Sequence, residues 1–271
     1  MSAPGCEALG PALGSGREAD VYPCGEGAVL KLFRPDFGGH RAEAVTLWSL
    51  DGHGVAPRLL DVVERDGRTG LVLQRLPGPD MLALLQRQPW RVFRLARLLA
   101  ETHLAVNRLP APPELPALRE VLAGRIADAA LPQRLADFVA RVLDPLPDGD
   151  RLCHGDYHPG NVLVTPSGAA VIDWGAATRG APEADHARTL LLLRWADPLP
   201  GSSLLSRLVI ASGRSLLASA YTRAYGRGPL PARAAASWLV VHAAARLSEG
   251  IPAERDMLIG RLERARRRSI A

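Results

Sequence analysis

The order of apolar and polar residues changes character early in the chain. Up to about residue 76 the apolar runs are short, alternate with polar residues and are separated by turn residues such as Asp66-Gly67, a pattern that predicts β-strands. One segment, 41–50, instead places Ala44, Leu47 and Trp48 at the spacing of one helix face. The expected strands are 20–22, 28–33, 59–63 and 70–74. This first part therefore predicts an antiparallel sheet with one helix.

Beyond residue 76 the pattern becomes mainly helical. Apolar residues from Val92 to His103 recur on one face of a segment that ends near Asn107, and a Pro-rich connector follows at 110–116. Further on we expect a strand pair at 161–164 and 169–172, then helices at 183–196, 202–225, 231–247 and 253–268. The expected fold class is α+β, with an N-terminal lobe at 1–76 and a helical C-terminal lobe at 77–271.

Composition and charge narrow the class of protein. With 47% hydrophobic residues the chain of 271 residues can bury a full core, and no apolar run approaches the roughly twenty residues that cross a bilayer. The N-terminus also lacks the features of a secretory signal. Much of the net charge of +5 lies at 261–268, without interleaved aromatic residues. We expect a cytoplasmic monomer or weak dimer that binds neither nucleic acid nor membrane.

The three cysteines add little chemistry. Cys6, Cys24 and Cys153 are an odd number and have no Cys-x-x-Cys spacing, which fits neither a disulfide framework nor a zinc site. We expect all three to be reduced thiols.

Polar residues that suit phosphoryl transfer lie in and after a loop shaped by Pro and Gly. Asp156 and Asn161 stand five positions apart, and Asp173 ends the next expected strand. Phosphoryl transfer needs one group that orients the attacking hydroxyl and accepts its proton, and oxygen ligands that hold magnesium on the phosphates. Asn161 is one of two asparagines and Lys31 is the only lysine in an arginine-rich chain.

These residues resemble the aminoglycoside phosphotransferase and choline kinase family, which has a two-lobed protein-kinase-like fold. The family pattern His-Gly-Asp-x-His-Pro-x-Asn stands here at residues 154–161, and its Ile-Asp-Trp segment surrounds Asp173. The resemblance implies that Asp156 is the catalytic base and that Asn161 and Asp173 hold Mg²⁺. His158 takes the catalytic-loop position two residues after the base, where protein kinases carry lysine.

The resemblance extends to the first part of the chain, where 13–22 is similar to the family's glycine-containing loop over the nucleotide. It implies that Lys31 pairs with the α- and β-phosphates of ATP and that Glu43 holds the lysine from a helix. Strand alternation places Val29 on the same face as Lys31. The residues expected to bind ATP are Gly14, Ser15, Gly16, Val21, Val29, Lys31, Glu43, Gln74, Leu76, Leu163 and Ile172.

Other residues of the expected helical lobe are assigned structural roles. By resemblance, Asp185 supports the catalytic loop. His103 is interpreted as a structural histidine. The aromatic residues Trp195, Trp238, Tyr221 and Tyr225 are interpreted as core rather than as a cage for a quaternary ammonium group.

The sequence therefore predicts a Mg-ATP-dependent kinase that phosphorylates a hydroxyl group of a small molecule, whether aminoglycoside-, macrolide-, amino-alcohol- or sugar-like. Carboxylates that suit a cationic acceptor occur at Glu183, Glu249, Glu254 and Asp256, but the basic net charge argues against a polycation. Two alternatives are a kinase of the same fold that acts on protein and an inactive nucleotide-binding regulatory module. A role in antibiotic resistance and one in metabolism both stay open.

Overall fold

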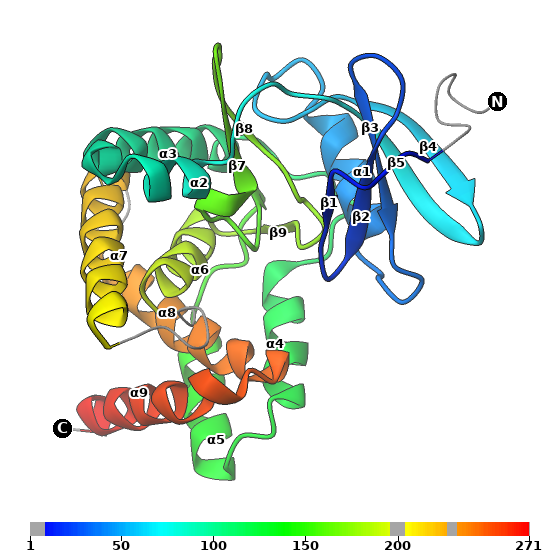
Figure 1. Cartoon of the computed structure of the whole chain (residues 1–271). Coiled ribbons are helices and arrows are strands. Elements are labelled where there is room, and N and C mark those ends of the chain that lie inside the picture. The colour runs from blue at the N-terminus through cyan, green and yellow to red at the C-terminus, as the bar shows by residue number, and fades with distance from the viewer. Residues whose placement is uncertain (1–8, 196–203, 227–231, 271) are drawn as a thin grey trace. The chain divides into compact units, whose positions relative to one another are not determined.

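The computed structural model describes residues 9–195, 204–226 and 232–270 (Figure 1). The chain divides into two compact units. The first comprises the chain up to Leu84 together with Pro159–Ala177, and the second comprises Leu85–His158 and the chain from Thr178 onward. The division falls within the motif at 154–161, so its last three residues, with the chain up to Ala177, belong to the unit of the N-terminal sheet. The lobe boundary expected at residue 76 stays a prediction.

The first unit is built on a five-stranded antiparallel sheet in the order β1-β2-β3-β5-β4 (Figure 1). Its strands are β1 (Gly14–Ser15), β2 (Ala19–Pro23), β3 (Ala28–Phe33), β4 (Leu59–Arg65) and β5 (Arg68–Gln74). In β3 the buried Leu30 and Leu32 alternate with half-buried Val29 and Lys31. The sequence prediction of this sheet is confirmed, because the period-two alternation marks which side chains enter the core.

Helix α1 (His40–Ser49) is present where the sequence predicts it, but the expected buried face is wrong in part. Its buried residues are Glu43, Thr46 and Leu47, whereas Trp48 is 68% exposed. The helix is rotated from the face that apolar residues alone indicate, because the carboxylate of Glu43 is turned inward to the amine of Lys31. The inward face of the helix therefore carries Glu43, paired with Lys31, and the ring of Trp48 faces solvent.

A second hairpin completes the first unit. Strands β7 (Val162–Thr165) and β8 (Gly168–Val171) pair antiparallel, as expected from sequence. The amide of Val164 donates to the carbonyl of Pro79, and the amide of Val171 donates to the carbonyl of Val55. These bonds fix the hairpin, and the residues that follow it, to the unit that carries the sheet.

The second unit is mainly helical. Its helices are α3 (Val92–Asn107), α4 (Leu118–Asp128), α5 (Gln133–Leu143), α6 (Pro182–Trp195), α7 (Leu204–Tyr225), α8 (Ala232–Arg246) and α9 (Pro252–Ile270), with a short η1 (Pro89–Arg91) and η3 (Leu247–Glu249). Helix α2 (Met81–Arg87) precedes them, and η2 (Pro159–Asn161) precedes β7. These bounds confirm the expected helices to within a few residues.

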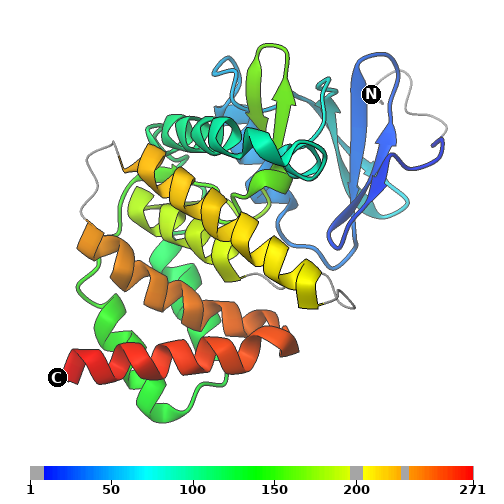
Figure 2. The same ribbon diagram turned by 60° about the vertical axis from the view of Figure 1, so that its left-hand side comes forward.

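Helix α8 is the centre of the helical packing. It packs against α4, α5, α6 and α9, and Figure 2 shows it between α6 and α9. Two apolar clusters lie along it, one around Trp238 and Val241 and one around Ala244 and Leu258. Strands β6 (Arg151–Cys153) and β9 (Thr178–Gly180) pair antiparallel in a two-stranded sheet. In sequence, β6 precedes the motif at 154–161 and β9 follows it.

The cysteines differ from expectation. Cys153 is a free, buried thiol, but Cys24 is disulfide-bonded, so the prediction of a reduced thiol is wrong at that position. Cys6 lies outside the described residues. None of the helices in the described ranges combines the length and the apolar character needed to cross a bilayer.

Candidate functional site

In the first unit, Lys31 is placed by strand β3 and its cross-strand neighbours. Val21 of β2 pairs with Lys31, and Leu71 of β5 pairs with it on the other side. A central strand position fixes the backbone on both sides, so the lysine amine is presented from a rigid element.

The amine of Lys31 contacts two carboxylates from distant parts of the sequence. Its Nζ lies 2.8 and 2.6 Å from the two carboxylate oxygens of Glu43 and 2.8 Å from Oδ1 of Asp173. Burial opposes the charge of Lys31, but the two carboxylates outweigh it and raise the pKa of the amine. Burial raises the pKa of Glu43, and the charge of Lys31 offsets part of this rise. Lys31 is therefore a charged amine held in one position.

Asp173 and Asn161 lie close together at the end of the second hairpin. The amide of Ile172 donates to the carbonyl of Asn161 at 3.0 Å, which brings the residue before Asp173 alongside Asn161. Asp173 has a φ of 67°, a left-handed conformation that costs about 1–2 kcal/mol for a residue with a Cβ. Such strain is concentrated at functional sites in proteins.

The side chains of Asn161 and Asp173 fit a magnesium ion that is also bound by phosphates. Both offer oxygen ligands, and the side chain of Asp173 is 38% exposed despite its contact with Lys31. Among the described residues no group of three or more His, Cys, Asp or Glu side chains is arranged to hold a metal. A site of two protein oxygens completed by phosphate and water is how Mg²⁺ is bound in nucleotide enzymes. The role of these two residues stays a prediction.

The glycine-containing loop forms a turn that is fixed by its own side chains. The amide of Gly16 donates to the carbonyl of Ala19, and the hydroxyl of Ser15 donates to Oδ1 of Asp20 at 2.7 Å. Asp20 also pairs with Arg34 and Arg68. Gly14 has open space where a Cβ would stand. The loop is exposed, and its expected place over the phosphates stays a prediction.

The other residues expected to bind ATP also lie in the first unit. Val21 and Val29 are half-buried on β2 and β3, and Leu163 and Ile172 are half-buried on and after the second hairpin. Gln74 ends β5, and Leu76 follows it half-buried. The first unit thus carries every expected nucleotide residue, but their contacts with a nucleotide stay predictions.

In the second unit, Asp156 is an ionised carboxylate with a cation beside it. Its Oδ1 lies 3.5 Å from the guanidinium of Arg188 and its Oδ2 lies 3.5 Å from Nε2 of His158, while 37% of the side chain is exposed. Burial disfavours its charge, but the bond with His158 and the charge of Arg188 outweigh it and lower its pKa. Asp156 is therefore ionised at neutral pH and reachable from solvent.

The backbone before Asp156 is fixed by Asp185 of α6. The amide groups of His154 and Gly155 donate to the carboxylate of Asp185 at 2.8 and 2.9 Å. Gly155 has a φ of 79°, where a residue with a Cβ is strained, and this conformation lets both amides point to one carboxylate. Tyr157, the residue after Asp156, is fully buried and donates to the carbonyl of Leu99. Asp185 supports the loop, as the sequence interpretation states.

Asp185 also accepts hydrogen bonds from α3. His103 Nε2 lies 2.9 Å from its Oδ2 and Asn107 Nδ2 lies 3.0 Å from the same atom. His103 is fully buried and also contacts the hydroxyl of Tyr221 at 2.7 Å. His103 is therefore structural, and Tyr221, Tyr225 and Trp238 are buried core residues as expected.

Sequence reasoning missed Arg188, and it named Glu249 and Glu254 only as carboxylates that suit a cationic acceptor. Arg188 lies on α6 with its side chain 7% exposed and donates to the carbonyl of Gly155 and to Glu249. Glu249 in turn accepts from Arg246, which pairs with Glu254 through two bonds. One sequence signal existed, since Arg188 follows Asp185 by three residues and so lies on the same helix face.

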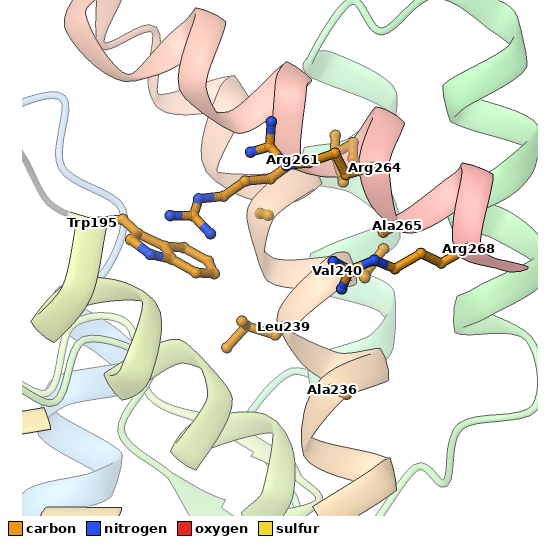
Figure 3. Close-up of a pocket in the computed structure, with 10 residues that line it drawn as sticks. Trp195, Ala236, Leu239, Val240, Arg261, Arg264, Ala265 and Arg268 are labelled. Carbon is orange, nitrogen blue, oxygen red and sulfur yellow. The ribbon is translucent and has the colours of Figure 1, made fainter. Parts of the chain in front are cut away.

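A pocket of about 330 Å³ lies elsewhere in the second unit, among α6, α8 and α9 (Figure 3). The guanidinium of Arg261 stacks on the ring of Trp195 at 3.9 Å, over an apolar floor that includes Leu239 and Val240. None of the predicted site residues lines this pocket. It is separate from the loop that carries Asp156.

The chain is similar to a known family and to a curated relative. The model of the phosphotransferase enzyme family matches residues 10–238. A hydroxyurea phosphotransferase of Kitasatospora aureofaciens is 38% identical over 178 residues, which are 59% of this chain and 49% of the relative. The match therefore spans about half the length of that curated relative.

Solved structures agree in fold. An aminoglycoside-3'-phosphotransferase of type VIII matches with a TM-score of 0.59 and 21% identity, over 90% of this chain and 94% of the other. An amicoumacin kinase in complex with AMP-PNP and Ca²⁺ matches with a TM-score of 0.62 and 14% identity, over 94% and 86%. At these identities the likeness shows a kinase-like fold.

Proposed function

Because the chain belongs to the phosphotransferase enzyme family, we propose that it transfers the γ-phosphoryl group of ATP, with Mg²⁺, to a hydroxyl group of a small molecule. The convergence of Lys31, Glu43 and Asp173 carries the proposal. Glu43 and Asp173 are 12 and 142 positions from Lys31 in sequence. A buried amine between two carboxylates stabilises a fold no more than apolar packing does. A role in binding phosphate and metal explains their presence.

In the first unit, the chain's own residues would bind and orient the nucleotide. Lys31 would bind the α- and β-phosphates from its position on β3, with Glu43 holding the amine. The turn at Gly14 to Gly16 would cover the phosphates. Asn161 and Asp173 would hold the metal ion, which when bound neutralises charge on the phosphates and polarises the transferred group.

In the second unit, Asp156 would act as the catalytic base. It would orient the acceptor hydroxyl and accept its proton while the hydroxyl oxygen bonds to the γ-phosphorus and the bond to the ADP oxygen breaks. A lowered pKa keeps the carboxylate ionised and suits orientation more than strong basicity. His158 and Arg188 would hold Asp156 in position. Most of the rate acceleration would come from positioning and charge stabilisation.

The names of similar proteins suggest several classes of phosphate acceptor. The relative with 38% identity is named a hydroxyurea phosphotransferase, which makes hydroxyurea a candidate acceptor. The solved structures are named for aminoglycosides and amicoumacin, which makes antibiotics with hydroxyl groups candidates as well. Macrolides, amino alcohols and sugars complete the panel that the sequence suggests.

A panel of these hydroxyl compounds, incubated with the enzyme, ATP and Mg²⁺, tests the reaction through ADP release and mass spectrometry of the product. We expect one phosphate added to a small molecule. Phosphorylated protein instead would favour a protein kinase, and nucleotide binding without turnover would favour a regulatory module.

Asp156→Ala tests the assigned base. We expect turnover to fall by at least about a thousandfold, because positioning and proton acceptance are both lost, with ATP affinity changed less than about threefold. The matched control is Asp128→Ala, an exposed carboxylate at the end of α4, which should behave as wild type. Near-normal turnover in Asp156→Ala would contradict the assignment.

A further inference from the structure

The carboxylates near Asp156 are neutralised by arginines. Glu249 contacts Arg188 at 2.9 Å and Arg246 at 2.6 Å, and the buried Glu254 is paired with Arg246 through both of its oxygens. Both glutamates were candidates for attracting a cationic acceptor. Since each already pairs with a guanidinium in the folded protein, neither offers an unpaired charge to a polycation.

Arg125 adds a cation to this group. It lies on α4, which packs against α8 and η3, the elements that carry Arg246 and Glu249. The side chain is half-buried, and among the described residues Arg125 forms no ion pair within 4 Å. Burial and the nearby charge of Arg188 lower the pKa of Arg125, while Glu249 and Asp156 favour its charge. Arg125 is therefore a partly desolvated cation without an ion-pair partner in the part of the chain that the structure describes.

Three carboxylates (Asp156, Glu249, Glu254) thus face three guanidinium groups (Arg125, Arg188, Arg246). The group as a whole has no net negative charge, and the member without a partner is positive. A partly buried guanidinium is stabilised by an oxygen acceptor: a carboxylate accepts two parallel hydrogen bonds from it, and a carbonyl oxygen accepts from its N–H groups through one atom. An acceptor that carries such an oxygen near its hydroxyl would complete the group, whereas an ammonium would be repelled.

We propose that Arg125, beside Arg188, binds a carbonyl or oxyanion oxygen of the phosphate acceptor, which is therefore a small neutral or anionic hydroxyl compound and not a polycation. This inference rests on the proposed function, since it describes the acceptor that presents its hydroxyl to Asp156. Arg188 holds Asp156 and the loop carbonyl of Gly155, so its contacts are used within the protein. Arg125 donates to no other described residue, so its guanidinium donors are available to a ligand.

Three probes of similar size test the inference by titration in the presence of Mg²⁺ and ADP, followed by NMR. Glycolate and glycolamide carry an oxyanion or a carbonyl beside the hydroxyl, and ethanolamine carries an ammonium there. We expect the two oxygen-bearing probes to bind more tightly than ethanolamine. In Arg125→Gln their affinity should fall about ten- to a hundredfold, because a charge-assisted hydrogen bond is lost.

Two further variants separate recognition from folding. Arg125→Lys keeps the charge without the planar fork and should retain part of the affinity. Arg141→Gln removes an exposed arginine on α5 and should bind all probes as wild type. Circular dichroism should show that each variant is folded.

Three results would each overturn the inference: ethanolamine binding as tightly as glycolate, neither oxygen-bearing probe binding, or unchanged affinity in Arg125→Gln. The panel of hydroxyl compounds gives a second reading, because a polycation as the preferred acceptor would contradict the inference and leave the proposed function standing. Absence of any ATP-dependent phosphorylation would contradict the proposed function, and the titrations, which need no turnover, would still report on Arg125.

Discussion

At the residue scale, two carboxylates of the second unit, Asp185 and Asp156, differ in burial and in the groups around them. Asp185 is fully buried and accepts from two loop amides and two side chains. Burial disfavours its charge, but His103 and the amide of Gly155 outweigh it and lower its pKa. Asp156 is instead partly exposed, with Arg188 and His158 beside its carboxylate. The carboxylate that supports the loop and the one proposed as the catalytic base thus differ in their surroundings.

Replacing Asp185 should destabilise the protein. In Asp185→Asn the amide group would turn a donor toward groups that already donate, and we expect the free energy of unfolding to fall by about 3 kcal/mol. Urea denaturation followed by tryptophan fluorescence measures this. Asp137→Asn, an exposed carboxylate on α5, is the matched control and should change stability by less than about 0.5 kcal/mol. Equal stability of the two variants would show that the network contributes little.

At the element scale, the second hairpin depends on a close approach of the chain after β5. Gly78 has a φ of 126°, and a Cβ added there would collide with the carbonyl oxygen of Val164 on β7. The neighbouring bond from Val164 to Pro79 fixes this spacing. Strand β7 therefore keeps its place because residue 78 has no side chain.

Gly78→Ala should lower the free energy of unfolding by about 2–3 kcal/mol, since both the backbone conformation and the contact become strained. Gly213→Ala is a matched control, because Gly213 is exposed within α7 with open space around it. A helical Gly→Ala change should stabilise by up to about 1 kcal/mol. Thermal melts of both variants give opposite shifts, and a stabilised Gly78→Ala would refute the clash.

At the scale of the whole molecule, the helical unit buries neutral histidines. Burial, with the nearby His103, lowers the pKa of His186 to about 3, and burial with the charge of Arg188 lowers the pKa of His242 to about 3. In the unfolded chain both histidines titrate near 6.5. Between these values the unfolded state binds more protons than the folded state.

Stability should therefore fall as the pH is lowered from about 6.5 toward 3, with a slope approaching about 1.4 kcal/mol per pH unit for each histidine. In His242→Leu one of these protons is removed, so the slope of unfolding free energy against pH should decrease by about one proton. Urea denaturation at a series of pH values measures the slope. An unchanged slope in His242→Leu would show that this imidazole is protonated in the fold.

Much of the fold could be predicted because it depends on local patterns. Strand β3 agrees with its expected bounds, and α3 does as well, since alternation and helical spacing are visible within a few residues. The buried face of α1 was predicted wrongly because hydrophobicity alone does not reveal that Glu43 turns inward to Lys31. The partner that decides the rotation is on another element.

The sequence by itself determined the phosphotransfer motif, the strand that carries Lys31 and the positions of Asp156, Asn161 and Asp173, because these follow from residue types and short spacings. The pairing of Glu43 with Lys31 was also expected, by resemblance, but only the tertiary structure decided which charges meet around Asp156. Arg188 and Glu249 are 61 residues apart, and Arg125 reaches the same group from a third helix. Their pairing depends on how α4, α6 and η3 pack, and packing is settled by the whole core. The neutral character of the group around Asp156 is therefore a property of the fold.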